Sequence, residues 1–242
     1  LSISNETINN IDCKDQDNGS IDITVAGGTA NYTYAWTKTG DNSYSATSQD
    51  LSSLSPGTYN VTITDANNCT LTKSFTITEP DQLVSSGTIS NFNGFGISCN
   101  GSNDGSIDLS VSGGTANYTY AWTKTGDNSF SATTQDLSNL SPGTYNVTVT
   151  DANDCTTTNS FEITEPAELL IADAGLSTEI ACFGDNGQIR VNVTQASVAN
   201  YTYALYQGNS VVQTVTNSNL NHTFNAPAGT YKVRVTDANG CF

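Results

Sequence analysis

The chain repeats itself at an interval of 86 positions, and this period constrains its architecture more than any single motif does. Trp36 recurs as Trp122, and the two cysteines of the first copy recur at matching places in the second. A fixed period of this kind is the signature of a tandem array, in which each copy folds as one structural unit. A third, more divergent copy follows, with the anchors Cys182, Tyr201-Thr202-Tyr203, Ala228-Gly229-Thr230-Tyr231 and Cys241.

The borders between the copies fall at two Glu-Pro pairs, Glu79-Pro80 and Glu165-Pro166. Proline cannot continue a central strand and it stiffens a short linker, so each pair suits the end of a repeat. We therefore expect three domains, at residues 1–80, 81–166 and 167–242. The third copy stops before the segment that would match residues 70–80, which predicts a truncated last strand.

Apolar and polar residues alternate with a period of two in several short runs, which is the pattern of half-buried β-strands. Ile21, Ile23 and Val25 form one such run, and turn residues such as Asn18-Gly19 bound it. The first copy is expected to have strands at residues 1–11, 19–26, 31–38, 43–47, 49–54, 58–65 and 69–78. About seven short strands in one repeat are typical of a β-sandwich. The predicted fold is all-β, with three tandem immunoglobulin- or fibronectin type III-like β-sandwich repeats arranged as a rod.

The aromatic residues of one run are candidates for the core. Trp36 lies in phase with Tyr32 and Tyr34, so the three side chains should point to the same face of their strand. A packed core is the interpretation that this pattern favours, and an exposed tryptophan that stacks on a ligand is the alternative. The predicted core aromatics are Tyr34, Trp36, Tyr59, Tyr120, Trp122 and Tyr145.

The charge balance excludes several partners. The chain has 23 acidic residues against 7 lysines and arginines, and its formal net charge is −16. Nucleic acids and anionic lipids need cations for binding, so neither is an expected partner. No stretch approaches the ~20 apolar residues of a membrane helix, and we expect no membrane insertion of this segment. The sequence contains no methionine and begins with Leu1, which predicts that it belongs to a longer protein.

Residues that could carry catalysis are scarce. His222 is the only histidine and occurs in one copy of three, so the abundant serines have no recurring histidine partner. An enzyme needs a positioned nucleophile, base or metal, and we therefore expect neither an enzymatic activity nor an organic cofactor.

Calcium is the one cofactor that the acidic residues leave open. Residues 15–19 begin like an EF-hand loop, but Ala26 stands at the twelfth position, where that loop needs a bidentate glutamate. A calcium site at the junction of two repeats is the remaining hypothesis, because acidic loops of both would meet there. Its candidate ligands are Asp15, Asp17, Asp151, Asn153 and Asp154.

The six cysteines, two in each copy, indicate disulfides and an extracellular location. Zinc is disfavoured because no CxxC pair exists. A pairing within the repeats would be Cys13–Cys69, Cys99–Cys155 and Cys182–Cys241, and a pairing between repeats would be Cys13–Cys155 and Cys99–Cys241. The expected strand directions favour the second pairing. A strand of ~8 residues would separate Cys13 from Cys69 by roughly 25 Å, whereas the α-carbons of a disulfide lie within about 7 Å.

The order and spacing of these motifs resemble the SprB repeat. The matching strings are Asp17-Asn18-Gly19-Ser20-Ile21-Asp22, Gly27-Gly28-Thr29-Ala30, Tyr32, Tyr34, Trp36, Gly57-Thr58-Tyr59 and Asp65-Ala66-Asn67 with Cys69. The resemblance implies a long surface adhesin of gliding Bacteroidetes bacteria, exported by the type IX system and propelled along the cell by the gliding machinery. The third copy departs from this pattern, since Gln195-Ala196-Ser197-Val198 replaces the Gly-Gly turn and Leu205 replaces the tryptophan.

Two classes of function remain open. The first is a repeat segment of a bacterial cell-surface adhesin, which acts as an extended stalk or adhesive filament in gliding motility and surface attachment. The second is a calcium-dependent or carbohydrate-binding module whose loops grip a ligand. Near-identity of the first two copies favours the stalk, although multivalent weak binding would also use identical copies. The expected partners are neighbouring repeats and an extracellular surface, glycan or protein.

Overall fold

The computed structural model describes residues 1–178, 184–195 and 198–242, and the elements in these residues are β-strands without any helix. The prediction of an all-β, immunoglobulin-like chain is therefore confirmed. The strands group into three- and four-stranded sheets, and each sheet draws its strands from one copy of the sequence repeat.

The first repeat consists of two antiparallel sheets. One sheet has the order β1-β2-β5, with β1 (Ser2–Asn9), β2 (Gly19–Ala26) and β5 (Leu51–Leu54). The other has the order β4-β3-β6-β7, with β4 (Asp41–Ala46), β3 (Thr33–Lys38), β6 (Gly57–Thr64) and β7 (Thr70–Ile77). Each strand lies within a few residues of its expected position.

The inward-facing residues of both sheets meet in one core. Ile21 and Ile23 of β2 are fully buried, as are Val61 and Ile63 of β6, because alternate residues of a strand point to the same face. Trp36 of β3 is 1% exposed, and its indole Nε1 donates a hydrogen bond of 2.9 Å to the carbonyl of Ser48. The tryptophan therefore packs inside the sandwich.

Two of the aromatic residues that we expected in the core lie at its rim instead. Tyr34 and Tyr120 are half-buried. The phenol ring of Tyr34 packs against the core, while its hydroxyl donates a hydrogen bond of 3.1 Å to Gln49 Oε1. An amphipathic side chain of this kind keeps its polar end near solvent, which the period-two pattern does not reveal. Tyr59 and Tyr145 are each 1% exposed.

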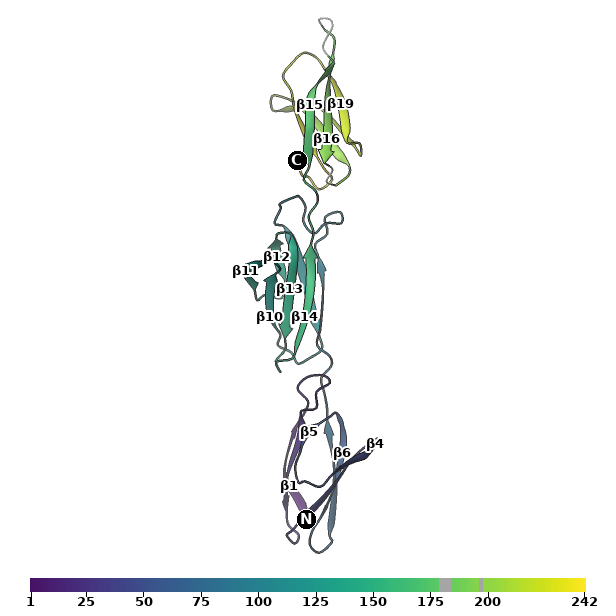
Figure 1. Cartoon of the computed structure of the whole chain (residues 1–242), viewed down its shortest axis with the longest axis vertical. Helices are drawn as coiled ribbons and strands as arrows, with labels where there is room; N and C mark the ends of the chain where they lie inside the picture. Colours follow the sequence, from purple (N-terminus) through teal and green to yellow (C-terminus); the bar gives the residue numbers. More distant parts are fainter. Residues whose placement is uncertain (179–183, 196–197) are drawn as a thin grey trace. The chain divides into compact units, whose positions relative to one another are not determined.

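The second repeat has the same strand order. Its sheets are β12-β9-β8 and β11-β10-β13-β14, and β10, β13 and β14 lie side by side in Figure 1. The strands are β8 (Val84–Ile89), β9 (Gly105–Ser112), β10 (Thr119–Lys124), β11 (Asp127–Ala132), β12 (Leu137–Leu140), β13 (Gly143–Thr150) and β14 (Thr156–Ile163). Trp122 is 1% exposed and its indole donates to the carbonyl of Thr134.

One insertion distinguishes the second repeat from the first. In the first repeat a single residue separates β1 from Ile11, whose N–H donates to Thr78. In the second repeat, residues 91–96 form a short hairpin, closed by the backbone bridge between Phe92 and Phe95, before Ile97 makes the equivalent bond. The hairpin lies directly before the second cysteine-bearing loop.

The third repeat keeps the pattern with fewer strands. Its sheets are β15-β16-β19 and β18-β17-β20. They consist of β15 (Leu170–Thr178), β16 (Gly187–Gln195), β17 (Tyr201–Gln207), β18 (Ser210–Asn217), β19 (Asn221–Ala226) and β20 (Lys232–Thr236). Leu205 occupies the place of the tryptophan and is fully buried beside Tyr203.

Contacts divide the chain into two compact units whose limits differ from the repeat borders. The first comprises Leu1–Ser86, Val111–Tyr120 and Thr148–Thr158. The second comprises Gly87–Ser110, Ala121–Val147 and Asn159–Phe242. Each unit thus joins parts of two successive repeats, and the residues that make these connections form the candidate site.

Candidate functional site

A five-residue turn with the pattern Asp-Ala-Asn-x-Cys ends the sixth strand of each repeat, and we call it the carboxylate turn (residues 65–69, 151–155 and 237–241). In the second copy, Asp151 Oδ1 accepts hydrogen bonds of 2.9 Å from the backbone N–H groups of Asn153 and Cys155. Its Oδ2 accepts one of 2.8 Å from the N–H of Thr115. Aspartate often closes a turn on its own backbone in this way, and the third bond ties the turn to the loop before β10.

The first and third copies build the same turn. Asp65 accepts bonds of 2.9 Å from the N–H groups of Thr29, Asn67 and Cys69. Asp237 Oδ1 accepts bonds of 2.9 Å from the N–H groups of the asparagine and cysteine of its own turn, Asn239 and Cys241. The three aspartates are 4–5% exposed, so the turn surrounds each carboxylate.

The Gly-Gly pair of the first two repeats makes room for this carboxylate. Gly114 has a φ of +62°, which side chains other than glycine rarely adopt, and a Cβ there would lie 2.6 Å from Asp151 Oδ2. Glycine is therefore required at this position by both conformation and space. The Gly-Gly motif and the aspartate therefore pack against each other and form one structural unit.

Hydrogen bonding favours the ionised form of Asp65 and Asp151. Burial opposes ionisation of Asp151, but the N–H groups of Thr115, Cys155 and Asn153 outweigh it and lower the pKa of the carboxyl. The N–H groups of Thr29 and Cys69 likewise lower the pKa of Asp65. Because their oxygens are already occupied by backbone donors, these aspartates are poorly placed to hold a metal.

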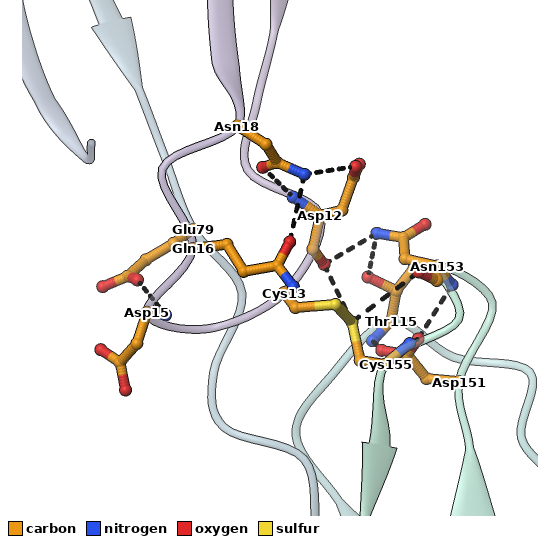
Figure 2. The surroundings of a disulfide bond; sticks show 10 residues. All are labelled: Asp12, Cys13, Asp15, Gln16, Asn18, Glu79, Thr115, Asp151, Asn153 and Cys155. Atoms are coloured by element: carbon orange, nitrogen blue, oxygen red, sulfur yellow. Dashed lines mark hydrogen bonds between the residues drawn. A yellow bond between two sulfur atoms is a disulfide. The ribbon is translucent and has the colours of Figure 1, made fainter. Parts of the chain in front are cut away.

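The second carboxylate turn is linked to the cysteine loop of the first repeat (residues 12–18), and we call this the first joint. Figure 2 shows the disulfide between Cys13 and Cys155, whose α-carbons lie 5.7 Å apart. Beside it, Asn153 Nδ2 donates a hydrogen bond of 3.1 Å to the carbonyl of Asp12. A covalent bond and a polar contact therefore hold the same loop.

Side chains within the cysteine loop brace the first joint. Asn18 accepts a bond of 3.2 Å from the N–H of Asp12 and donates one of 2.7 Å to its carboxylate. Glu79 forms an ion pair with Lys14 and accepts a bond of 3.1 Å from the N–H of Asp15. The loop is thereby tied to the Glu-Pro linker.

The second joint connects the third carboxylate turn to the cysteine loop of the second repeat (residues 98–104). Cys99 and Cys241 form a disulfide with α-carbons 5.6 Å apart. Asn239 Nδ2 donates to the carbonyls of Ser98, at 2.9 Å, and Phe92, at 3.3 Å. Asn93 of the inserted hairpin donates to Asn239 Oδ1, so the asparagine is held from both sides.

The structure excludes the alternative pairing, in which each disulfide would lie within one repeat. Ile11, close to Cys13, bonds to Thr78 at the end of β7, whereas Cys69 immediately precedes the start of β7. An eight-residue strand spans about 26 Å, so a Cys13–Cys69 bond is out of reach, and the same holds for Cys99–Cys155. Cys182 lies outside the described residues, and Cys241 is bonded to Cys99 instead.

The calcium candidates come from both sides of the first joint but do not converge. Asp15, Asp17 and Asp154 are exposed, and the Asp15 N–H is engaged with Glu79. Both oxygens of Asp151 accept backbone bonds, and the Asn153 amide serves Asp12 and Thr115. In the part of the chain that the structure describes, no three His, Cys, Asp or Glu side chains are grouped to hold a metal ion.

His222 contributes to packing. Its ring lies 4.6 Å from the ring of Phe224 and 5.6 Å from that of Tyr203, between centroids. Burial lowers the pKa of the imidazole, which keeps the ring neutral at pH 7.

Two features of the joints were absent from the sequence-based predictions. These are the bond from the N–H of Thr29 or Thr115 to the buried aspartate, and the hairpin at residues 91–96. The recurrence of Asp-Ala-Asn-x-Cys in all three copies was the available signal for the first. The described residues contain no helix long and apolar enough to cross a membrane.

Similar folds occur among solved structures of tandem immunoglobulin-like domains. The chicken CNTN1 FN1–FN3 domains are 13% identical to this chain, with a TM-score of 0.29, and the match covers 98% of this chain and 94% of that one. Sidekick-1 immunoglobulin domains 1–5 are 12% identical, with a TM-score of 0.37, and the match covers 97% of this chain and 58% of that one. No curated protein matches the sequence.

A family model matches the chain three times. The model described as SprB repeat matches residues 5–40, 97–126 and 175–210. Each match contains one cysteine, Cys13, Cys99 or Cys182.

Proposed function

Because the chain carries SprB repeats in three segments, we propose that it is a load-bearing stalk region of a large bacterial cell-surface adhesin. The repeats follow one another as an extended rod, divided near residues 80 and 166. The protein acts outside the cell, in surface attachment and in gliding. Its repeats are structural domains without a catalytic role.

One observation carries this proposal, namely that each joint bonds a cysteine to another 142 positions further along the chain. Successive repeats are thus connected twice, once by the Glu-Pro linker and once by a disulfide. A single linker allows two domains to pivot, whereas two attachment points resist bending and shear. A stalk pulled by a moving cell needs this resistance.

The polar contacts of the joints support the same role. Asn153 and Asn239 each donate to a backbone carbonyl of the opposing cysteine loop. A contact to the backbone is independent of the side chain presented, so the same turn can join repeats that differ in sequence. An adhesin with many repeats requires such a general connection.

The test is attachment under flow by bacteria that produce the full adhesin. Replacing Cys155 and Cys241 with serine removes both disulfides and leaves the sandwich cores intact. We expect normal attachment in still medium and several-fold lower retention as shear rises. Replacing the exposed Cys69 with serine serves as the control, and antibody labelling confirms equal surface amounts.

Equal retention of the double variant and the control at every shear rate would contradict the load-bearing role. Small-angle scattering of the purified segment provides a second test. An extended particle is expected, and a compact globular one would contradict the rod. Loss of attachment in still medium as well would favour a loop-borne ligand site over a stalk.

A further inference from the structure

We propose that the outer face of the sheet β18-β17-β20, in the third repeat, binds an acidic polysaccharide. Lys232 and Arg234 of β20 hold sugar carboxylates, and Tyr206 of β17 stacks on a sugar ring. The inference goes beyond the stalk function, because it gives one repeat a ligand of its own. It depends on neither disulfide joint, so each proposal can fail without the other.

Strand register places these three side chains on one face of the sheet. Tyr206 is paired with Lys232, and Ala204, two positions earlier, is paired with Arg234. Opposite residues of antiparallel strands point to the same side of a sheet. Leu205, between the two on β17, points to the other side and is fully buried in the core. Lys232 and Arg234 are therefore exposed neighbours, about 7 Å apart along the strand, and one carboxylate can meet both.

The same side chains border an open hollow beside the hairpin between β17 and β18. The hollow has a volume of about 470 Å³ and is lined by Tyr206, Gly208, Asn209, Lys232, Val233 and Arg234. Small-molecule sites have volumes of roughly 300–1,000 Å³. The tyrosine ring offers an apolar surface to the C–H groups of a sugar, and the Asn209 amide can hydrogen-bond to its hydroxyl groups. A guanidinium binds a carboxylate through two parallel N–H bonds, so the hollow combines the groups that recognise a charged sugar.

Aromatic rings hold the guanidinium of Arg234. Its Cζ lies 5.9 Å from the centroid of the Tyr206 ring and 4.3 Å from that of the Phe242 ring. Contacts over the face of a ring engage the flat side of the guanidinium, whereas its N–H groups lie in the guanidinium plane. These N–H groups can therefore donate to a ligand.

The two cations differ from the others in having no anionic or hydrogen-bonding partner in the described part of the chain. The chain has 7 lysines and arginines against 23 acidic residues, so carboxylate partners are abundant. The other five cations each bond to a polar side chain of the protein, and they are Lys14, Lys38, Lys73, Lys124 and Arg190. Among the described residues, neither Lys232 nor Arg234 forms an ion pair. Their charge is available to an external anion.

The binding groups are specific to the third repeat. At the positions of Tyr206, Lys232 and Arg234, the first repeat has neutral side chains without a ring, namely Thr37, Asn60 and Thr62. The second repeat has Thr123, Asn146 and Thr148. Three differences thus add one ring and two positive charges to a single face of one sheet.

The site lies on the flat side of the sheet and not at its edge. In the first repeat, β7 pairs with β6 and lies beside Asn60 and Thr62, which remain half-buried at the surface. A strand that paired with β20 would likewise border Lys232 and Arg234 without covering them.

The local charge at this face favours an anion, although the whole chain has a net charge of −16. Residues 198–242 contain one acidic residue, Asp237, and the carboxylate turn encloses it. Exposed charges more than ~10 Å away are largely screened at 0.1 M salt. The two cations therefore dominate the attraction that a ligand meets at this face.

One aromatic ring beside two cations fits a ligand that carries its charge on rings. In an acidic polysaccharide the carboxylate is attached to the sugar ring, so one sugar can meet Tyr206 and a cation together. An acidic peptide carries its carboxylates on flexible chains and has no ring to stack. A nucleic acid has a charge at every phosphate and is bound by longer rows of cations.

The experiment measures binding of polygalacturonic acid to the whole chain by calorimetry, in a low-salt buffer with a chelator that removes calcium. The methyl ester of the same polymer is the matched ligand, because it keeps the sugar rings and loses the charge. We expect the acid to bind at least tenfold more tightly than the ester, and its affinity to fall several-fold as salt rises. Equal affinity for both polymers, or no binding of the acid, would overturn the inference.

Variants that copy the first repeat locate the site. Lys232→Asn and Arg234→Thr introduce the residues that the same fold has at positions 60 and 62, so thermal unfolding should be unchanged. Each should weaken binding of the acid about tenfold. Arg190→Thr, on the exposed side of β16 in the other sheet, is the matched control, because it removes the same charge from the same repeat. Normal binding by the first two variants, or an equal loss in the control, would refute the site.

Tyr206→Thr separates recognition of a sugar from attraction of any polyanion. This variant keeps both cations and loses the ring, so binding of polygalacturonic acid should fall several-fold. Poly-glutamate and double-stranded DNA, tested on the unaltered chain, should bind at least tenfold more weakly than the polysaccharide. If either binds as tightly, or if Tyr206→Thr has no effect, the face is a general anion surface and the polysaccharide assignment is wrong.

Discussion

The two joints share one set of contacts and differ in how these are braced. In both, a disulfide is accompanied by an asparagine that donates to the carbonyl before the loop cysteine. In the first joint Asn153 reaches one carbonyl of the loop, that of Asp12. In the second, the hairpin at residues 91–96 adds the Phe92 carbonyl and the Asn93 amide around Asn239.

The glutamates of the two Glu-Pro linkers also share one contact and differ in another. In the first joint Glu79 meets both a lysine, Lys14, and the backbone N–H of Asp15. In the second, Glu165 accepts a bond of 3.0 Å from the N–H of Gly101, the residue that corresponds to Asp15. The first joint therefore depends more on an ion pair and the second on backbone contacts. This difference can be tested joint by joint.

The largest effect is expected from removing a disulfide. Each one closes a loop of 142 positions, and chain entropy predicts a loss of about 4–5 kcal/mol in the free energy of unfolding when it is opened. Cys155→Ser should also remove most hydrogen-exchange protection from residues 12–18. Cys241→Ser should leave residues 98–104 partly protected, because the hairpin contacts remain. Cys69→Ser is the control, and equal loss of protection at both joints would contradict the comparison.

The next effect concerns the carboxylate inside the turn. Asp151→Ala strands three backbone donors, and we expect a loss of about 2–4 kcal/mol in thermal or denaturant unfolding. Asp65→Ala, in the turn whose cysteine is free and exposed, should destabilise its own repeat in the same direction. Asp17→Ala, at an exposed position, is the control. A neutral result for Asp65→Ala would contradict the stabilising role of these backbone bonds.

Replacing the asparagine of either joint should cause a smaller loss of stability, and the loss should differ between the two joints. Asn153→Ala removes one neutral hydrogen bond to the opposing loop, with an expected loss of about 1 kcal/mol. Asn239→Ala removes two carbonyl contacts and the bond from Asn93. The expected loss in the free energy of unfolding is about twice as large. Unfolding of the two variants in parallel measures the ratio. The reverse order would show that the hairpin contributes nothing to the second joint.

The smallest effect is expected with pH at the first joint. The ion pair with Lys14 and the N–H of Asp15 lower the pKa of Glu79, although burial opposes this. A carboxyl whose folded pKa is depressed contributes its full stabilisation above its unfolded value of about 4.3, and loses it as pH falls through the folded pKa. Protection factors in residues 12–18 should therefore fall below about pH 4. Glu79→Gln should remove that dependence, and an unchanged loss of protection in this variant would contradict the role of Glu79.

Much of the fold followed from local patterns. The strand expected at residues 19–26 lies at Gly19–Ala26, and Trp36 is buried as its phase predicted. Both predictions succeed because alternation and turn residues depend on only a few neighbouring positions. The hairpin at residues 91–96 was not predicted, because a five-residue insertion without alternating apolar and polar residues gives no periodic signal. Tyr34 escaped it as well, because the alternation gives the side of the strand but not the depth of the ring.

The chain's own order of residues thus decided that it would be a tandem array of small β-sandwiches with a recurring Asp-Ala-Asn-x-Cys turn. Two cysteines in each copy are compatible with bonds within a repeat or between repeats. The expected strand directions favour the second case, and the folded structure decides it. The length of β7 separates Cys13 from Cys69, and the disulfide joins Cys13 to Cys155 of the next repeat. Spacing along a sequence is a local property, whereas the distance between two sulfur atoms is set by where whole sheets end.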